Sequence, residues 1–300
     1  MTGGPGPWMP TAPCTPGDCA APHRTRASRT RAVLRLTAGT ATVLAGVALS
    51  PLTVPAGRRA RRALTRLWCR TVLRAFGVRV HVTGGPPSPG PQLVVANHIS
   101  WLDIPLVAAV LPGRMVAKRE VRHWPVLGPL AARGGTLFLD RDRLRSLPCL
   151  VRTMADALDA GFRVVVFPEG STWCGRAQGR FRPAAFQAAL DAGVPVQPVR
   201  IVYRPLGPAP YVGEDTLGAS LWRIVTAGRL TAELRLLDPF PPGCHPDRRA
   251  LARAAQDVVE VRPYDAQTAV DRDRPNHPCS SVHHRDSARP AAASSVRTPS

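Results

Sequence analysis

The sequence contains very little lysine, and its first part contains almost no acid. Lys118 is the only lysine, so nearly all of the formal net charge of +20 comes from arginine. We attribute this arginine bias partly to coding composition. Residues 1–80 hold thirteen arginines against one acid, Asp18. A part this basic needs an anionic partner, and either membrane phosphates or nucleic acid would satisfy that need.

Paired cysteine motifs and a nucleophilic serine motif are also missing. The chain has seven cysteines, an odd number, and none of them is in C-x-x-C spacing. This pattern offers no readable disulfide framework or zinc motif, and it favours a reducing compartment. The absence of a G-x-S-x-G elbow argues against an α/β-hydrolase type of serine enzyme.

Composition divides the chain into four predicted parts. Residues 1–31 are rich in Pro, Gly, Thr and Arg and are expected to form a disordered basic tail. Residues 32–77 are expected to form a membrane anchor followed by an amphipathic basic helix. Residues 78–261 form the main domain, and residues 262–300 form a second disordered tail.

Within the second part, Leu36 to Gly57 is uncharged for 22 residues, which is long enough to cross a bilayer. Ala, Gly, Thr and Pro outnumber Leu and Val in this segment, so the sequence leaves open whether it spans the bilayer or rests on its surface. The arginines that follow favour a cytoplasmic C-terminal side. A cleaved signal peptide is the alternative, and the lack of a clear A-x-A site argues against it.

Residues 58–76 alternate arginine with large apolar side chains, which predicts an amphipathic helix. Such a helix either lies on anionic lipid or packs its apolar face on the core, and the two are compatible. From residue 78 onward, candidate strands alternate with helical stretches. The helical stretches include 144–160 and 184–192, each followed by a glycine. The strand candidates are 79–83, 93–96, 114–117, 136–139, 163–167, 196–202 and 232–236. The alternation predicts an α/β domain with a mostly parallel or mixed sheet flanked by helices.

The central motif is Asn-His-x4-Asp, and it follows the buried strand 93–96. Ser100 is a suitable N-cap for the apolar helix that follows, and Asp103 fits a capping-box-like start. His98 then lies in the preceding loop and can fold back onto the first helical turn. Asp103 would accept the proton of one imidazole nitrogen and leave the other nitrogen as a base. The alternative is a capping Asp103 beside an ordinary loop histidine.

Other polar residues follow other predicted strands. Lys118, Arg141 and Glu169 each come after one, and sites in such sheets gather at the carboxyl ends of the strands. The guanidinium of Arg141 suits a phosphate. Pro168 stops strand pairing and Gly170 permits a tight turn, which presents Glu169 at a strand end. Each of these residues also has an ordinary interpretation as a solvated cation or a turn carboxylate.

Four blocks in this order resemble the signature of the glycerolipid acyltransferase family, whose bacterial archetype is 1-acylglycerol-3-phosphate acyltransferase. The resemblance covers about residues 78–240 and implies a glycerol-3-phosphate acyltransferase-like fold. Ser171 stands where the family often has Thr, and Thr172-Trp173-Cys174 replaces a common Arg-Ser-type sequence, so the acceptor is open. The blocks are Asn97–Asp103, Gly135–Arg141, Phe167–Ser171 and Val194–Val199.

The resemblance implies that His98 removes a proton from an acceptor hydroxyl, which attacks an acyl thioester, while Asp103 orients the imidazole. Acyl-CoA or acyl carrier protein is the implied donor, a membrane lysolipid is the acceptor, and no metal or cofactor is implied. The residues implied to bind substrate are Lys118, Gly135, Arg141, Glu169, Gly170 and Ser171.

The expected reaction converts 1-acylglycerol-3-phosphate to phosphatidate in phospholipid biosynthesis, at the cytoplasmic face of the cell membrane. Lyso-ornithine lipid or another lysolipid is the alternative acceptor. A cysteine enzyme with Cys174 near His98 is a competing mechanism. A basic nucleic-acid-binding protein is a competing class, although no nucleic-acid module is recognisable and no nucleic acid is expected.

Overall fold

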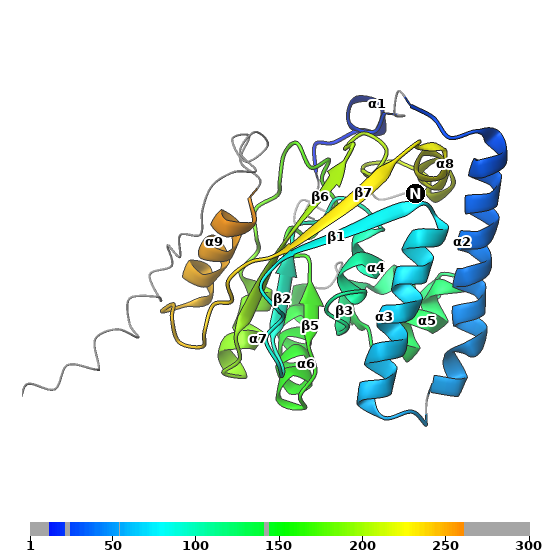
Figure 1. Cartoon of the computed structure of the whole chain (residues 1–300). Helices are drawn as coiled ribbons and strands as arrows, with labels where there is room; N and C mark the ends of the chain where they lie inside the picture. The colour runs from blue at the N-terminus through cyan, green and yellow to red at the C-terminus, as the bar shows by residue number, and fades with distance from the viewer. Residues whose placement is uncertain (1–11, 22–24, 54, 141–143, 261–300) are drawn as a thin grey trace, which may run out of the picture. The chain divides into compact units, whose positions relative to one another are not determined.

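The computed structural model describes residues 12–21, 25–53, 55–140 and 144–260. Within these ranges seven strands form one sheet in the order β1-β7-β6-β2-β5-β3-β4 (Figure 1). The strands are β1 (Val78–Gly84), β2 (Leu93–Ala96), β3 (Arg114–Lys118), β4 (Leu137–Leu139), β5 (Val164–Val166), β6 (Val196–Arg204) and β7 (Leu230–Leu236). Each lies where the sequence predicts a strand.

The sheet is mixed, as predicted. β6, β2, β5, β3 and β4 run parallel to one another, whereas β7 is antiparallel to β6 and parallel to β1. Every residue of β2 and β5 is buried. Central strands that are covered on both faces have continuous apolar sequences, and β2 and β5 both have this pattern. The carboxyl ends of the five parallel strands therefore meet at one edge.

Helices cover both faces of the sheet. Side chains of β2 alternate between the two faces, so Val94 packs with α3, α4 and α8, and Val95 packs with α6, α7 and α9. The helices are α1 (Pro16–Cys19), α2 (Arg29–Leu49), α3 (Arg58–Ala75), α4 (Asp103–Ala108), α5 (Leu127–Arg133), α6 (Leu147–Asp159), α7 (Ala184–Asp191), α8 (Leu217–Thr226) and α9 (Arg248–Val259).

α2 and α3 lie side by side along one flank of the domain (Figure 1). Glycines allow this close approach, since a Cβ on Gly39 would lie 2.3 Å from the Phe76 ring and one on Gly46 would lie 2.2 Å from Trp68. The indole of Trp68 donates to the carbonyl of Thr42 at 2.9 Å. The helix from Arg29 to Thr53 is long and apolar enough to cross a membrane by length and composition.

The disorder predicted for residues 1–31 is wrong for residues 12–21 and for residues 25–31, where α2 begins at Arg29 and the N–H of Ala27 donates to the carbonyl of Thr226 at 2.9 Å. Thr15 caps α1, and the backbone N–H of Ala21 donates to the carbonyl of Gly207 at 3.1 Å. The physical reason is burial of cysteine, because Cys14 packs with Cys174 and Val212 in a small core of its own. Residues 262–300, the second predicted tail, lie outside the described residues.

Candidate active site

Asn97 fixes the end of β2 against β6. Its side-chain amide donates to the carbonyl of Ile201 at 2.9 Å, and its side-chain oxygen accepts from the Ile201 N–H at 2.8 Å. The side chain thus continues the pairing of the two strands by imitating a backbone amide. Because Asn97 is buried and held on both sides, His98 leaves the sheet at a fixed point.

His98 and Asp103 are in direct contact, as predicted. Nδ1 of His98 lies 2.8 Å from Oδ2 of Asp103, whose side chain is fully buried. An ionised carboxylate only accepts hydrogen bonds, so Nδ1 carries the proton and Nε2 keeps its lone pair. The same Oδ2 accepts the backbone N–H groups of Ile99 at 2.6 Å and Ser100 at 2.8 Å. The loop is folded around the carboxylate.

The prediction that Ser100 caps the following helix is wrong. α4 begins at Asp103, Leu102 occupies the N-cap position, and no side chain caps it. The Ser100 hydroxyl accepts only a long bond of 3.4 Å from the N–H of Leu102. A carboxylate is a stronger acceptor than a hydroxyl, so Asp103 takes the loop amides instead.

Tyr203 completes the surroundings of Asp103. Tyr203 lies near the carboxyl end of β6. Its hydroxyl donates to Oδ1 of Asp103 at 2.6 Å, and its side chain is fully buried. Burial, together with the charge and hydrogen bond of Asp103, raises the pKa of Tyr203 well above its ordinary value. Tyr203 therefore remains a donor at physiological pH. No local signal in the sequence marks this residue.

The loop after β5 contacts His98 from the other side. The ring of Phe167 stacks on the imidazole with centroids 4.1 Å apart and planes 17° apart. Oε2 of Glu169 accepts the backbone N–H of His98 at 3.4 Å. Ring stacking and the bond to Asp103 together leave the imidazole little freedom to rotate.

Glu169 is buried and carries a perturbed carboxyl. Burial raises its pKa to about 9, the N–H of His98 opposes the rise, and the charge of Asp103 adds to it. Glu169 is therefore protonated at neutral pH. Its second oxygen, Oε1, is buried and has no hydrogen-bond partner among the described residues. A neutral carboxyl with one unused oxygen can donate to or accept from a substrate.

A pocket of about 570 Å³ lies beside Glu169. Ser171 and Trp173 also line it, and within the described ranges the Ser171 hydroxyl and the Trp173 indole N–H have no partner. Its remaining polar lining is basic. The arginines that line it are Arg180, Arg182, Arg249 and Arg253. A concave site of this size with convergent cations and unused hydrogen-bonding groups suits an anionic headgroup.

The other predicted substrate-binding residues have different positions. Lys118 lies exposed at the carboxyl end of β3, with Nζ 5.8 Å from the centroid of the Trp124 ring. Gly170 turns the loop with φ of 77°, beside Glu169. Gly135 precedes β4 with φ of 73° and so lies at the opposite edge from His98, where it serves the turn. Arg141 falls outside the described residues.

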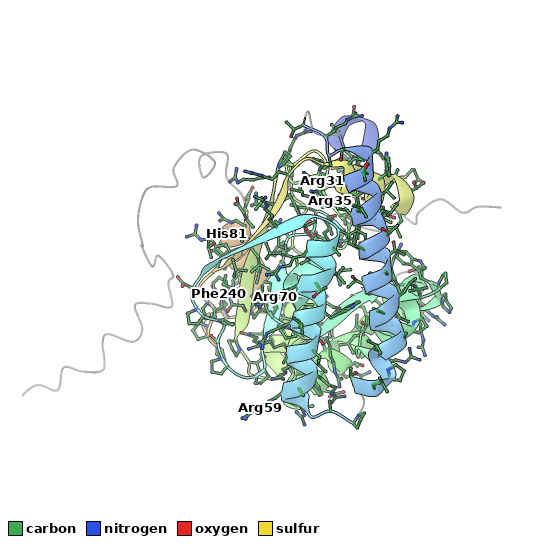
Figure 2. All side chains as sticks on the ribbon, turned by 45° about the vertical axis from the view of Figure 1, so that its right-hand side comes forward. Arg31, Arg35, Arg59, Arg70, His81 and Phe240 are labelled. Atoms are coloured by element: carbon green, nitrogen blue, oxygen red, sulfur yellow. The ribbon has the colours of Figure 1, made fainter. Side chains whose placement is uncertain are left out.

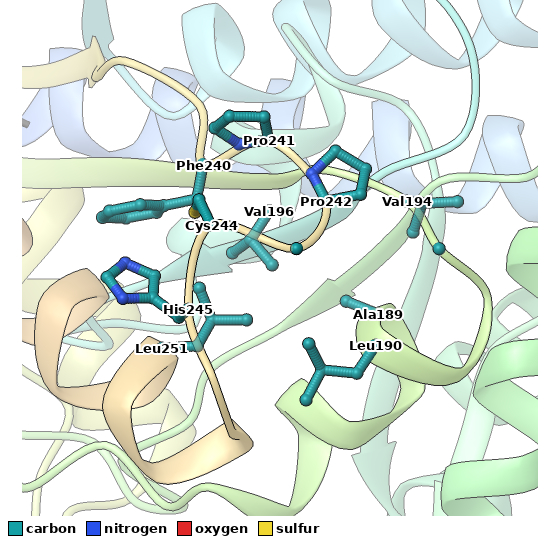
Figure 3. A pocket seen from close by; sticks show the side chains of 12 residues that line it. Ala189, Leu190, Val194, Val196, Phe240, Pro241, Pro242, Cys244, His245 and Leu251 are labelled. Carbon is teal, nitrogen blue, oxygen red and sulfur yellow. The ribbon is translucent and has the colours of Figure 1, made fainter. Parts of the chain in front are cut away.

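Two other features are neither contacts of the His98 side chain nor part of the lining of this pocket. Cys174, the alternative nucleophile, is buried with its sulfur beside those of Cys14 and Cys19. A smaller cavity of about 130 Å³ lies between α7 and the loop from Phe240 to His245 (Figure 3). Its lining includes none of the predicted site residues and is mostly apolar.

Comparisons with known proteins place the chain among related sequences. A family model described as Acyltransferase matches residues 78–202. The chain is 40% identical over 205 residues to a lyso-ornithine lipid O-acyltransferase of Pseudomonas aeruginosa, covering 67% of this chain and 78% of that protein. It is 35% identical over 207 residues to a 1-acyl-sn-glycerol-3-phosphate acyltransferase of Neisseria meningitidis, covering 67% and 81%.

The fold also matches a solved structure. The crystal structure of the 1-acyl-sn-glycerophosphate acyltransferase PlsC from Thermotoga maritima aligns with a TM-score of 0.64 at 21% identity. The alignment covers 81% of this chain and 97% of that one. The mixed sheet flanked by helices is therefore shared between the two proteins.

Proposed function

This chain belongs to the acyltransferase family, and from that premise we propose that it acylates the free hydroxyl of 1-acylglycerol-3-phosphate to give phosphatidate. The donor is an acyl thioester, either acyl-CoA or acyl carrier protein. The observation that carries the proposal is the imidazole of His98, which is held at Nδ1 by Asp103 and leaves Nε2 as a base.

The reaction needs one base and no covalent enzyme intermediate. Nε2 of His98 takes the proton of the acceptor hydroxyl as its oxygen attacks the thioester carbonyl. The carbon–sulfur bond then breaks, and the departing thiolate recovers the proton from the imidazolium. Asp103 stabilises that imidazolium, and Tyr203 holds the carboxylate in place. General base catalysis of this kind is typically worth about 10²- to 10⁴-fold.

The pocket beside Glu169 supports a phosphorylated acceptor. Four arginine side chains line it, and a guanidinium can give two parallel hydrogen bonds to a phosphate. The protonated carboxyl of Glu169 adds no negative charge to repel that phosphate. We assign the glycerol portion of the acceptor to Glu169 and Ser171, with Lys118 and Arg141 as further phosphate contacts.

α2 and α3 support a membrane-bound enzyme. Large apolar side chains are exposed on both helices, and arginines stand among them (Figure 2). Apolar side chains beside cations suit a surface of anionic lipid. We place the domain at the cytoplasmic face of the membrane, where a lysolipid acceptor resides. The exposed apolar residues on the two helices are Val33, Leu34, Leu44, Leu49, Leu64 and Leu67, and Leu52 is exposed in the turn that follows α2.

Lyso-ornithine lipid is the second candidate acceptor. It is favoured by the 40% identity to an enzyme named for that substrate. An ornithine headgroup offers a carboxylate and an amine in place of a phosphate. The arginines of the pocket suit the carboxylate, whereas the amine would need an anionic partner that a protonated Glu169 does not provide.

An assay of the detergent-solubilised protein against both acceptors, with each donor in turn, tests the proposal. We expect turnover of 1-acylglycerol-3-phosphate, and a loss of about 10²- to 10⁴-fold in kcat for His98→Ala with the fold retained. The double variant Arg249→Gln, Arg253→Gln should raise KM for the phosphorylated acceptor more than it lowers kcat. A His98→Ala enzyme as fast as the parent would refute the mechanism, and exclusive turnover of the ornithine lipid would change the acceptor.

A further inference from the structure

Three cysteines from distant parts of the chain meet at one place. Cys14 immediately precedes the cap of α1, Cys19 ends that helix, and Cys174 lies in the loop that follows Glu169. Their sulfur atoms all lie within 4.8 Å of one another. Cys14 and Cys174 are 7% and 4% exposed, so the sulfurs are largely shielded from water.

Backbone N–H groups donate to two of these sulfurs, and at Cys14 they only partly oppose burial, which raises the pKa of that thiol to about 12. The N–H groups of Arg176 and Ala177 donate to the sulfur of Cys174, across a turn made at Gly175 with φ of 79°. The N–H of Cys174 donates in turn to the sulfur of Cys14. Amide hydrogen bonds to cysteine sulfur favour thiolate, the form that binds metals.

We propose that Cys14, Cys19 and Cys174 together bind one thiophilic divalent cation, with Zn²⁺ the favoured ion. Zinc–sulfur bonds of about 2.3 Å in a tetrahedron bring ligand sulfurs about 3.8 Å apart, so small rotations of the side chains close the site. Thiolates select zinc over Mg²⁺ or Ca²⁺. Each thiol loses its proton to solvent as its sulfur binds.

The fourth position of the tetrahedron belongs to a water or an external ligand. Within the described ranges, the group of candidate ligands consists of these three cysteines, without a histidine or carboxylate. A site with three protein sulfurs and one open position still holds zinc tightly, because three thiolates neutralise more than its charge.

The cation would lock the N-terminal segment onto the loop beside the candidate active site. Arg176 already donates to the carbonyl of Asp18 at 3.1 Å. Cys174 directly follows Trp173, whose backbone N–H donates to the carbonyl of His98 at 2.8 Å. The crosslink would therefore tie residues 12–21 to a loop that contacts the backbone of His98. Bound zinc should raise the thermal stability and protect residues 12–21 from proteolysis.

Cobalt substitution of the intact protein tests the site. The full chain is purified in detergent with reductant, stripped with a chelator and titrated with Co²⁺. We expect sulfur-to-cobalt charge-transfer bands and tetrahedral visible bands that saturate at one equivalent and disappear on adding Zn²⁺. Cys14→Ser, Cys19→Ser and Cys174→Ser should each weaken the bands. Cys149→Ser changes an exposed cysteine and should leave them unchanged. Absence of the bands, or their persistence in all three variants, would overturn the proposal.

Two further measurements do not depend on a variant that folds. Native mass spectrometry of the parent should show one zinc per chain, and a chain without metal after zinc addition would overturn the proposal. Thiol titration of protein unfolded in chelator without reductant should find all seven cysteines reactive. Five reactive thiols would instead show one disulfide, and its assignment by peptide mapping to two of the three cluster cysteines would overturn the metal site.

Discussion

Removal of a single oxygen atom, in Tyr203→Phe, tests how Asp103 is held. The Tyr203 hydroxyl donates to Oδ1 of Asp103 at 2.6 Å, and both side chains are fully buried. The variant keeps the aromatic ring and its packing against the core. It removes the Tyr203 donor from a carboxylate that water cannot reach.

The size of the effect follows from the charge of the acceptor. A hydrogen bond to a charged group contributes about 1.5–3 kcal/mol. Loss of this bond should lower the free energy of unfolding by about 2 kcal/mol. If the bond is also stronger in the transition state than in the ground state, kcat should fall by about 10-fold for each 1.4 kcal/mol of that difference.

The assay compares kcat and chemical unfolding for the parent, Tyr203→Phe and a matched control, Tyr211→Phe. Tyr211 is half-buried, and its contact with the loop is a backbone N–H donated to the carbonyl of Ile99 at 3.0 Å, which the control retains. The control should therefore keep the parent kcat. If Tyr203→Phe shows the same kcat and the same free energy of unfolding as the parent, the hydroxyl does not position Asp103.

Three further changes probe other contacts. Glu169 has a pKa of about 9 in the fold against an ordinary 4.5, so its protonated form favours folding at low pH and that stability is lost as pH rises. Chemical unfolding should show Glu169→Gln gaining about 3 kcal/mol on the parent between pH 4.5 and pH 7, and a difference constant with pH would contradict this. Asn97→Ala removes both bonds to Ile201 and should lower the free energy of unfolding by about 2–4 kcal/mol; a loss below 0.5 kcal/mol would be inconsistent with their burial. Gly39→Val would drive a side chain into Phe76 and should lower Tm by several degrees, whereas an unchanged Tm would disprove the close packing of α2 on α3.

The strands could be predicted from the sequence because each one is marked locally. The run 93–96 is apolar and ends at a polar motif, and 164–166 is a valine run that ends before Pro168. The contact of His98 with Asp103 could also be predicted, since the two residues are five positions apart, in a loop and at the start of the helix that follows it. The capping residue could not be predicted from local preference, because two side chains in this segment can accept the backbone N–H groups. The carboxylate of Asp103 is the stronger acceptor and takes them in place of the Ser100 hydroxyl.

Contacts between distant segments could not be predicted. Tyr203 and Asp103 are 100 residues apart, and they meet only because β6 lies next to β2 in the sheet. That neighbour relation is a property of strand order, which no local pattern encodes. The same holds for Cys14, which composition assigns to a disordered tail and which the fold buries beside Cys174.

The place of β6 in the sheet has a consequence for synthesis. β6 lies between β2 and β7, and it supplies both Tyr203 and the partner of Asn97. A chain emerging from the ribosome exposes His98 and Asp103 long before that strand is translated. The nascent protein therefore carries His98 and Asp103 before the strand that holds them is made, and a chain interrupted before residue 196 would lack both the Tyr203 bond to Asp103 and the pairing of Asn97.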